Sequence, residues 1–205
     1  MYHGERFNAI SHLVGAGLAL VGLVVLIVVS SLHGDAWRVV SVTIYGVSLL
    51  ALYTSSTLYH SLRGRAKRVF RHLDHTAIYL LIAGSYTPFT LVSLRGRLGW
   101  WMFGVVWALA AFGALQEFRH VRGERILSVV IYIVMGWLAV LALGPLMTAL
   151  GPAGLSWLVA GGVCYTAGIV FYAFDGRLPA FHGIWHLFVL AGSVAHYVAI
   201  LGFVA

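Results

Sequence analysis

The chain has 205 residues, of which 61% are hydrophobic and only 9% are charged. Its mean hydropathy is +0.93, whereas about one-quarter of the residues of a soluble domain are charged, so the composition excludes a water-soluble globular protein. The net charge of +7 does not indicate nucleic-acid binding, because the basic residues form no amphipathic or aromatic-interleaved patch.

Seven apolar segments follow one another along the chain, and each provides the roughly 20 residues that a helix needs to cross a hydrocarbon core. They comprise residues 9–32, 36–62, 73–94, 98–118, 126–150, 153–174 and 180–204. The first is longer than the apolar part of a signal peptide, and no small-residue cleavage pattern follows it, so we expect an uncleaved span. The sequence predicts an all-α integral membrane protein, a seven-transmembrane helix bundle in a single domain over residues 1–205.

Two prolines fall inside predicted spans. Pro88 lies in the third and Pro145 near the end of the fifth. Proline has no backbone N–H to donate, so we expect each to kink its helix and to leave a carbonyl for a neighbouring group.

The basic residues predict the orientation. Seven spans place the two ends of the chain on opposite sides of the membrane. Of the thirteen Lys and Arg residues, only Arg38, Arg95 and Arg97 fall on one side, which leaves ten on the other. Because short cytoplasmic loops carry the excess of Lys and Arg, we expect a cytoplasmic N-terminus and an exoplasmic C-terminus.

An ionisable side chain inside a span costs about 2.5–3.5 kcal/mol on insertion scales and is a candidate functional group for that reason. Most carboxylates avoid this cost by lying in loops or at helix ends, Glu5 and Asp175 among them. Asp74 is the one carboxylate that enters an apolar helix. The histidines inside or at the ends of predicted spans are His12, His60, His75, His182, His186 and His196.

Several of these groups fall at one depth when they are placed on the predicted orientation. His60 lies near the cytoplasmic end of the second span, and Asp74 lies at the cytoplasmic start of the third. His182 and His186 occupy the first turns of the seventh span, and His12 lies in the cytoplasmic half of the first. Four helices therefore bring polar groups together just inside the cytoplasmic face.

The spacing of these histidines predicts a metal site. His182 and His186 are four residues apart, so on a helix their side chains lie about 6 Å apart and both can reach one ion. His60 is the best-placed third ligand for zinc. Three histidines leave a fourth position open, as in catalytic zinc sites, where the pKa of a bound water falls to about 7. Asp74 could serve as general base, and Ser56, one turn before His60, could donate to an oxyanion.

For the three remaining histidines, His12, His75 and His196, interhelical hydrogen bonding is the interpretation we favour.

The chain resembles the hemolysin III family, the bacterial relatives of the progestin and adipoQ receptors, in the superfamily that also holds alkaline ceramidases. The matching motifs are GERFNAISHLVGAGLALVG near the start, SSTLYHS at 55–61, LDHTAIYLLIAGSYTPF at 73–89 and FHGIWHLFVLAGSVAHY at 181–197. The resemblance implies a multi-pass protein of the bacterial plasma membrane. It also implies zinc bound by the histidine of a span-two SxxxH motif and both histidines of a span-seven HxxxH motif, accompanied by an aspartate that opens span three. The corresponding residues here are Ser56, His60, Asp74, His182 and His186.

Three functions follow as hypotheses. The leading one is a zinc-dependent hydrolase that cleaves an amide or ester bond of a membrane lipid, with Asp74 and Ser56 as catalytic residues. The second is a non-enzymatic regulator or sensor of membrane lipid homeostasis and energetics, in which zinc is structural. The third is a pore-forming haemolysin. In each case the expected partner is membrane lipid, and no nucleic acid is expected.

Overall fold

The computed structural model describes residues 4–119, 125–178 and 180–205. Every regular element among them is helical, as the sequence predicts. The helices are α1 (Arg6–Leu32), α2 (Ala36–Ser61), α3 (Gly64–Pro88), α4 (Arg97–Arg119), α5 (Arg125–Trp137), α6 (Leu143–Ala173) and α7 (Phe181–Phe203). A π-helical turn at Phe89–Ser93 extends α3, and a 3-10 segment at Leu138–Ala142 joins α5 to α6.

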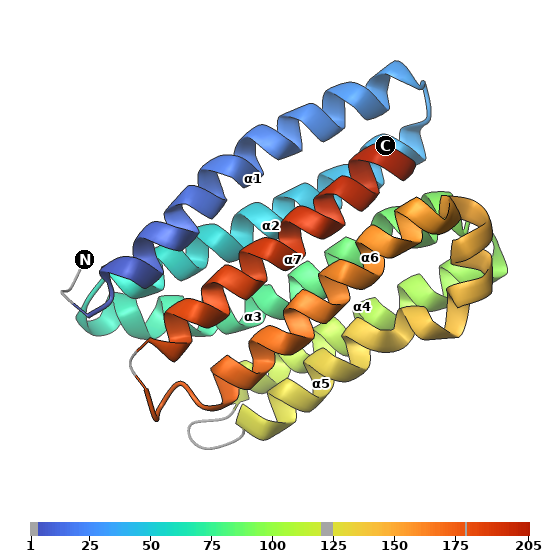
Figure 1. The fold of residues 1–205 in the computed structure, drawn as a ribbon. Coiled ribbons are helices and arrows are strands. Elements are labelled where there is room, and N and C mark those ends of the chain that lie inside the picture. The colour runs from blue at the N-terminus through green and yellow to red at the C-terminus, as the bar shows by residue number, and fades with distance from the viewer. Residues whose placement is uncertain (1–3, 120–124, 179) are drawn as a thin grey trace.

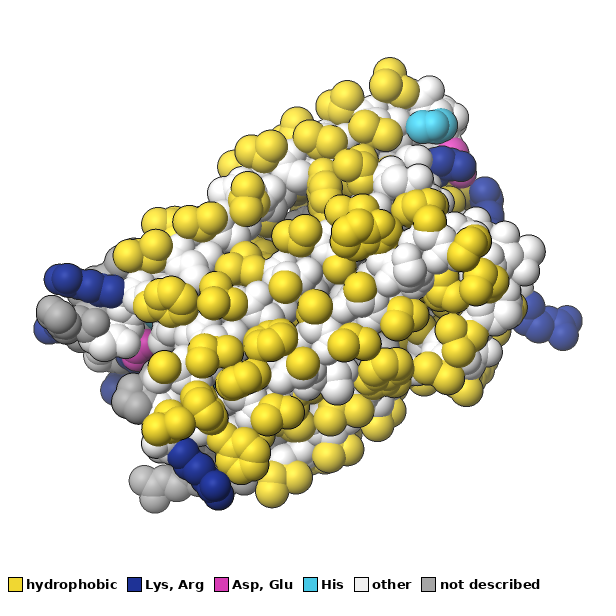
Figure 2. Space-filling view, in the orientation of Figure 1, with side chains coloured by type: hydrophobic (Ala, Val, Ile, Leu, Met, Phe, Trp, Pro, Cys, Tyr) yellow, Lys and Arg dark blue, Asp and Glu magenta, His cyan; other side chains and the backbone are white. Residues whose placement is uncertain are grey.

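The helices form an elongated bundle with their axes roughly aligned (Figure 1). Helix α1 lies on the outside beside α2 and α7, and α3 runs through the middle. Figure 2 shows hydrophobic side chains over the length of one face and Lys and Arg side chains at its two ends. On α1, Leu18 and Val21 expose more than half of their surface. A surface of this kind is suited to contact with lipid tails and identifies a membrane protein.

Six helical stretches within the described residues are long and apolar enough to cross a membrane. One of them, Ile126–Ala173, has 48 residues. As a straight helix it would be about 72 Å long, more than twice the roughly 30 Å of a hydrocarbon core. It is not straight, because Gly151 has φ 66° and ψ 176°, a left-handed conformation that glycine adopts without strain. The chain reverses direction between α5 and the body of α6 (Figure 1).

The two prolines behave differently. The irregular backbone expected at Pro88 is the π-helical turn that begins at the next residue. Pro145 does not kink its own helix, because it lies in the first turn of α6, where a missing N–H leaves no bond unmade. The interruption of the helix lies before Pro145, at Leu138–Ala142. Tyr86 of α3 hydrogen-bonds to the backbone at this interruption. The Tyr86 hydroxyl donates to the Gly136 carbonyl and accepts from the Ala139 N–H, each at 2.8 Å.

Candidate metal centre

Three imidazole rings meet at one end of the bundle. His60 lies in the last turn of α2, and His182 and His186 lie in the first two turns of α7. The ring centroids are 5.0 Å apart for His60 and His182, 5.0 Å for His60 and His186, and 4.8 Å for His182 and His186. One nitrogen from each ring lies within 4.8 Å of the other two, an arrangement that could hold a metal ion.

Each ring is fixed through its Nδ1 atom. His60 Nδ1 donates to Glu5 Oε2 at 2.5 Å, and His182 Nδ1 donates to Asp175 Oδ2 at 2.8 Å. His186 Nδ1 donates to the Asn8 carbonyl at 3.2 Å. Because carboxylates and carbonyls only accept, the proton of each neutral ring resides on Nδ1. In this tautomer each Nε2 atom is an acceptor, which is the form that binds a metal.

The Nε2 atoms face one another without a proton between them. Those of His60 and His182 are 3.3 Å apart, and His186 Nε2 is buried without a hydrogen-bond partner. Two nitrogens bound to one zinc ion at 2.0–2.1 Å in tetrahedral geometry are separated by about 3.3–3.4 Å. The three-histidine donor set and the spacing of this one pair are compatible with zinc, and a cation there would relieve the repulsion between facing lone pairs.

Glu5 connects this cluster to the basic end of α3. Its carboxylate accepts from Lys67 Nζ at 2.8 Å as well as from His60. Partial burial raises the pKa of Glu5, but the hydrogen bonds from Lys67 and His60 outweigh burial and hold this pKa at about 2. Glu5 is therefore ionised at neutral pH and remains an acceptor for His60.

Asp74 and Ser56 lie together but apart from the three rings. Asp74 is 5% exposed and Ser56 only 1%, and the Ser56 hydroxyl hydrogen-bonds to the Asp74 carboxylate. Asp74 does not belong to the group of atoms within 4.8 Å that could bind the ion. Asp74 also lines the cavity described next.

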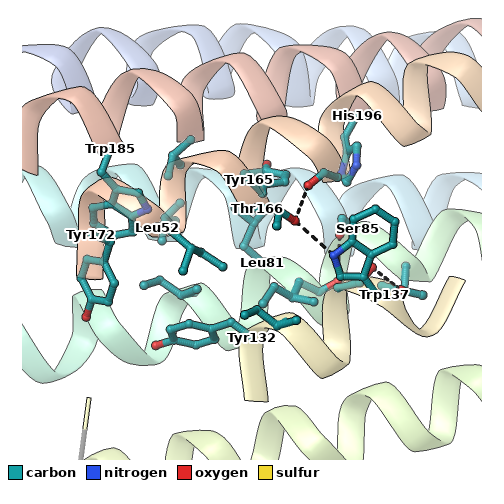
Figure 3. Close-up of a pocket in the computed structure, with 18 of the residues that line it drawn as sticks. Leu52, Leu81, Ser85, Tyr132, Trp137, Tyr165, Thr166, Tyr172, Trp185 and His196 are labelled. Carbon is teal, nitrogen blue, oxygen red and sulfur yellow. Dashed lines mark hydrogen bonds between the residues drawn. The ribbon is translucent and has the colours of Figure 1, made fainter. Parts of the chain in front are cut away.

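A cavity of about 110 Å³ begins at Asp74 and His12 and runs along the inside of the bundle. Its walls come mainly from α3, α5, α6 and α7, and most of the side chains drawn in Figure 3 are apolar or aromatic. The labelled lining residues are Leu52, Leu81, Ser85, Tyr132, Trp137, Tyr165, Thr166, Tyr172, Trp185 and His196. A second cavity of about 280 Å³ shares Ser85, Tyr86, Trp137 and His196 with the first and continues toward Leu94. Cavities with such apolar linings are typical of sites that bind apolar ligands.

The other three histidines have separate environments. His12 of α1 stacks on His186, with ring centroids 3.6 Å apart. His75 of α3 lies 3.4 Å from Glu117 of α4. His196 of α7 interacts through Nε2 with the Leu158 carbonyl of α6 at 3.2 Å. His75 and His196 make the interhelical contacts that the sequence favoured, whereas His12 makes a ring contact only.

Sequence reasoning missed the groups that orient the rings. It set Glu5 and Asp175 aside as residues of loops and helix ends, and it gave the Asn8 carbonyl no role. One signal was available. Both carboxylates lie at the predicted depth of the histidines, and metal-binding histidines commonly donate their second N–H to a carboxylate.

A family model described as "Haemolysin-III related" matches residues 1–197 of the chain. The chain belongs to the haemolysin-III-related family. One similar protein is "Hemolysin-3" of Bacillus cereus, which is 46% identical to this chain over 201 residues. The match covers 98% of this chain and 91% of the relative. "Hemolysin-3 homolog" of Bacillus subtilis (strain 168) is 45% identical over 198 residues, 96% of this chain and 92% of the relative. "Monocyte to macrophage differentiation factor" of Homo sapiens is 32% identical over 175 residues, 82% of this chain and 72% of the relative.

Proposed function

We propose that the protein is a zinc-dependent hydrolase of the bacterial plasma membrane that cleaves an amide or ester bond of a membrane lipid. Zinc is held by His60, His182 and His186. The protein crosses the membrane seven times, with its N-terminus in the cytoplasm, and the metal centre lies near the cytoplasmic face.

One observation carries the proposal. Three ring nitrogens that can only accept converge beside a cavity whose lining is mainly apolar and aromatic. Three histidine ligands are typical of a catalytic zinc site because they leave a coordination position for water or substrate. A structural site with four protein ligands has no such position.

The 48-residue stretch supports the seven spans, because a segment of this length that turns at Gly151 divides into two membrane-length helices. The excess of Lys and Arg on one side supports the orientation.

In the proposed reaction the zinc ion, the cavity, Asp74 and Ser56 have different roles. A zinc ion at this position supplies a Lewis acid and lowers the pKa of a bound water. The cavity holds the acyl chain of the lipid and excludes bulk water. Asp74 takes the proton of the attacking water on its carboxylate and returns it to the leaving nitrogen or oxygen. Ser56 hydrogen-bonds to Asp74 and orients that carboxylate, so its part is positioning and not the oxyanion contact expected from spacing alone.

The test uses protein purified without a His-tag. We expect about one zinc per chain, and we expect zinc-dependent release of fatty acid from at least one lipid in a panel of ceramides, other N-acyl lipids and ester lipids. His60→Ala and His182→Ala should lose both zinc and turnover, whereas His33→Ala, on the exposed end of α1, should lose neither. Folded, zinc-loaded protein that turns over no lipid in a broad panel contradicts the enzyme proposal.

A second candidate follows from the position of the ligands on different helices. Since His60 belongs to α2 and the other two belong to α7, zinc would clamp these helices in a regulator or sensor of membrane lipid state. This candidate predicts a large fall in melting temperature on zinc removal and no turnover. The two Bacillus relatives are named hemolysins, and release of dye from liposomes is the direct measurement for the pore-forming hypothesis.

A further inference from the structure

His12 is a buried histidine with two unused ring nitrogens. The residue is 2% exposed, and neither Nδ1 nor Nε2 makes a hydrogen bond. The His186 backbone lies near the ring but forms no hydrogen bond of normal length and angle with it. A neutral imidazole always has one N–H donor and one acceptor nitrogen, whichever tautomer is present. Burying both ring nitrogens without hydrogen-bond partners lowers the stability of the fold and therefore needs an explanation.

Packing alone does not explain why a histidine is buried at this position. Its ring lies flat on His186, with 3.6 Å between centroids and 9° between planes, and edge-on to Tyr53 at 5.0 Å. A phenylalanine ring would make the same two contacts without leaving any polar atom unpaired. The histidine therefore costs stability in the unliganded bundle.

His12 also differs from the three metal-binding candidates. His60, His182 and His186 each donate Nδ1–H to a fixed acceptor, which makes Nε2 the atom that would bind the ion. His12 has no such acceptor on either nitrogen, and it does not belong to the group of three that could hold a metal. The chain thus orients three rings for an ion and leaves the fourth without an orienting partner.

His12 lines the cavity. The cavity lining includes His12 and Asp74 but none of the three metal-binding candidates. Because its ring stacks on His186, His12 lies at the boundary between the cavity and the candidate metal centre. The polar head of a lipid whose chain occupies the cavity and whose head reaches the metal would therefore lie near His12.

We propose that His12 is a substrate-positioning residue that hydrogen-bonds through a ring nitrogen to the polar head of the cavity's acyl ligand. This inference rests on the proposed function. It assigns to His12 a contact with the ligand and not with the ion. An acyl head group always offers a carbonyl oxygen, which accepts the N–H of the neutral ring.

The test compares zinc binding with ligand binding. The probe is palmitoyl hydroxamate, whose oxygens coordinate zinc and whose chain fits an apolar cavity. We measure zinc affinity by chelator competition, hydroxamate affinity by calorimetry on zinc-loaded protein, and the melting temperature of metal-free protein. His12→Phe should keep zinc affinity, melt no lower than wild type, and bind hydroxamate about tenfold more weakly, the effect of one lost hydrogen bond.

Two further variants complete the series. His12→Gln, which retains a donor and an acceptor, should keep most of the hydroxamate affinity, and His12→Met provides a second apolar variant should the phenylalanine not fit. His33→Phe, at the opposite end of α1, is the matched control and should leave all three measurements unchanged.

The outcomes separate the two proposals. If wild type binds hydroxamate only with zinc, and His12→Phe and His12→Met bind it equally well, the role of His12 is refuted and the hydrolase proposal stands. Loss of zinc from these variants also refutes it, because His12 would then support the ion. If hydroxamate binding to wild type does not depend on zinc, the proposed hydrolase function fails first.

Discussion

The residues that orient the histidines come from two separate parts of the chain, the start of α1 and the segment between α6 and α7. Glu5 precedes α1, Asn8 lies in its first turn, and Asp175 lies between α6 and α7. Each accepts the Nδ1–H of a different ring. Such partners fix the tautomer and increase the basicity of the nitrogen that faces the metal. They should therefore influence metal affinity strongly although none of them is positioned as a ligand.

Asp175→Asn tests this effect. The substitution keeps the size of the side chain but removes its charge, so zinc affinity should fall by about 10–100-fold. Competition with a fluorescent zinc chelator measures the change. Glu117→Gln is the matched control, because Glu117 is paired with His75 and Ser128 away from the metal centre, and it should bind zinc as wild type does. Equal affinity in Asp175→Asn and wild type would contradict the prediction.

At the scale of the element, the connection from α5 to α6 depends on one hydroxyl of α3. Tyr86 both donates to the Gly136 carbonyl and accepts from the Ala139 N–H, so it replaces hydrogen bonds that a continuous helix would make itself. In a membrane no water compensates for such groups. The break also opens the inner wall of the bundle, because Gly136 and Trp137 line both cavities.

Tyr86→Phe should destabilise the bundle, since it leaves a buried carbonyl and a buried N–H unpaired. Each unpaired group costs about 1–3 kcal/mol, which corresponds to a fall in melting temperature of at least about 2 °C for a chain of this size. Thermal unfolding in detergent measures the change. Tyr59→Phe is the control, because the Tyr59 hydroxyl makes no hydrogen bond within the part of the chain that the structure describes, and the melting temperature of this variant should equal that of wild type. A Tyr86→Phe protein as stable as wild type would show that the hydroxyl is dispensable.

Long apolar runs predicted most of the helices, because a segment that can span a membrane is recognised by its length and its hydropathy. The start of α3 shows the limit of this signal. The helix begins at Gly64, nine residues before the apolar segment, since a helix continues beyond the hydrocarbon core where Arg65, Lys67 and Arg68 can reach water. The break at Leu138–Ala142 was also missed, because the hydroxyl that supports it comes from a residue 50 or more positions earlier in the chain.

The same distinction applies to the site. The approach of His60, His182 and His186 could be predicted from spacing and depth. The stacking of His12 on His186 could not, because it depends on how α1 is rotated about its axis. Hydropathy does not determine that rotation in a helix that is apolar on nearly all sides.

For the whole molecule, the proposed topology connects the site to one aqueous compartment. Seven spans with a cytoplasmic N-terminus would place the candidate metal centre within reach of cytoplasmic zinc and water. In this topology the first turns of α3 at Arg68 and the segment at Arg177 face the cytoplasm, and the turn before Ala153 faces outward.

Cysteine labelling on intact cells tests this topology in a Cys164→Ala background. A membrane-impermeant maleimide should label Arg95→Cys and Ala153→Cys, which lie on the exoplasmic side of the proposed bundle, and should label Arg68→Cys and Arg177→Cys only after the cells are opened. All four positions are exposed at ends of the bundle. Protection of Ala153→Cys in intact cells would contradict the division of residues 126–173 into two spans.

The candidate metal centre draws on the first two helices and the last, and under the proposed function this would set the order in which the protein matures. His60 and His182 are 122 residues apart, so at about 5–20 residues per second the ribosome makes the second proposed ligand on the order of ten seconds after the first. Throughout that interval the nascent chain would offer a single proposed zinc ligand, His60. Under the proposal, capture of the ion is therefore a late event of biosynthesis that follows the arrival of α7.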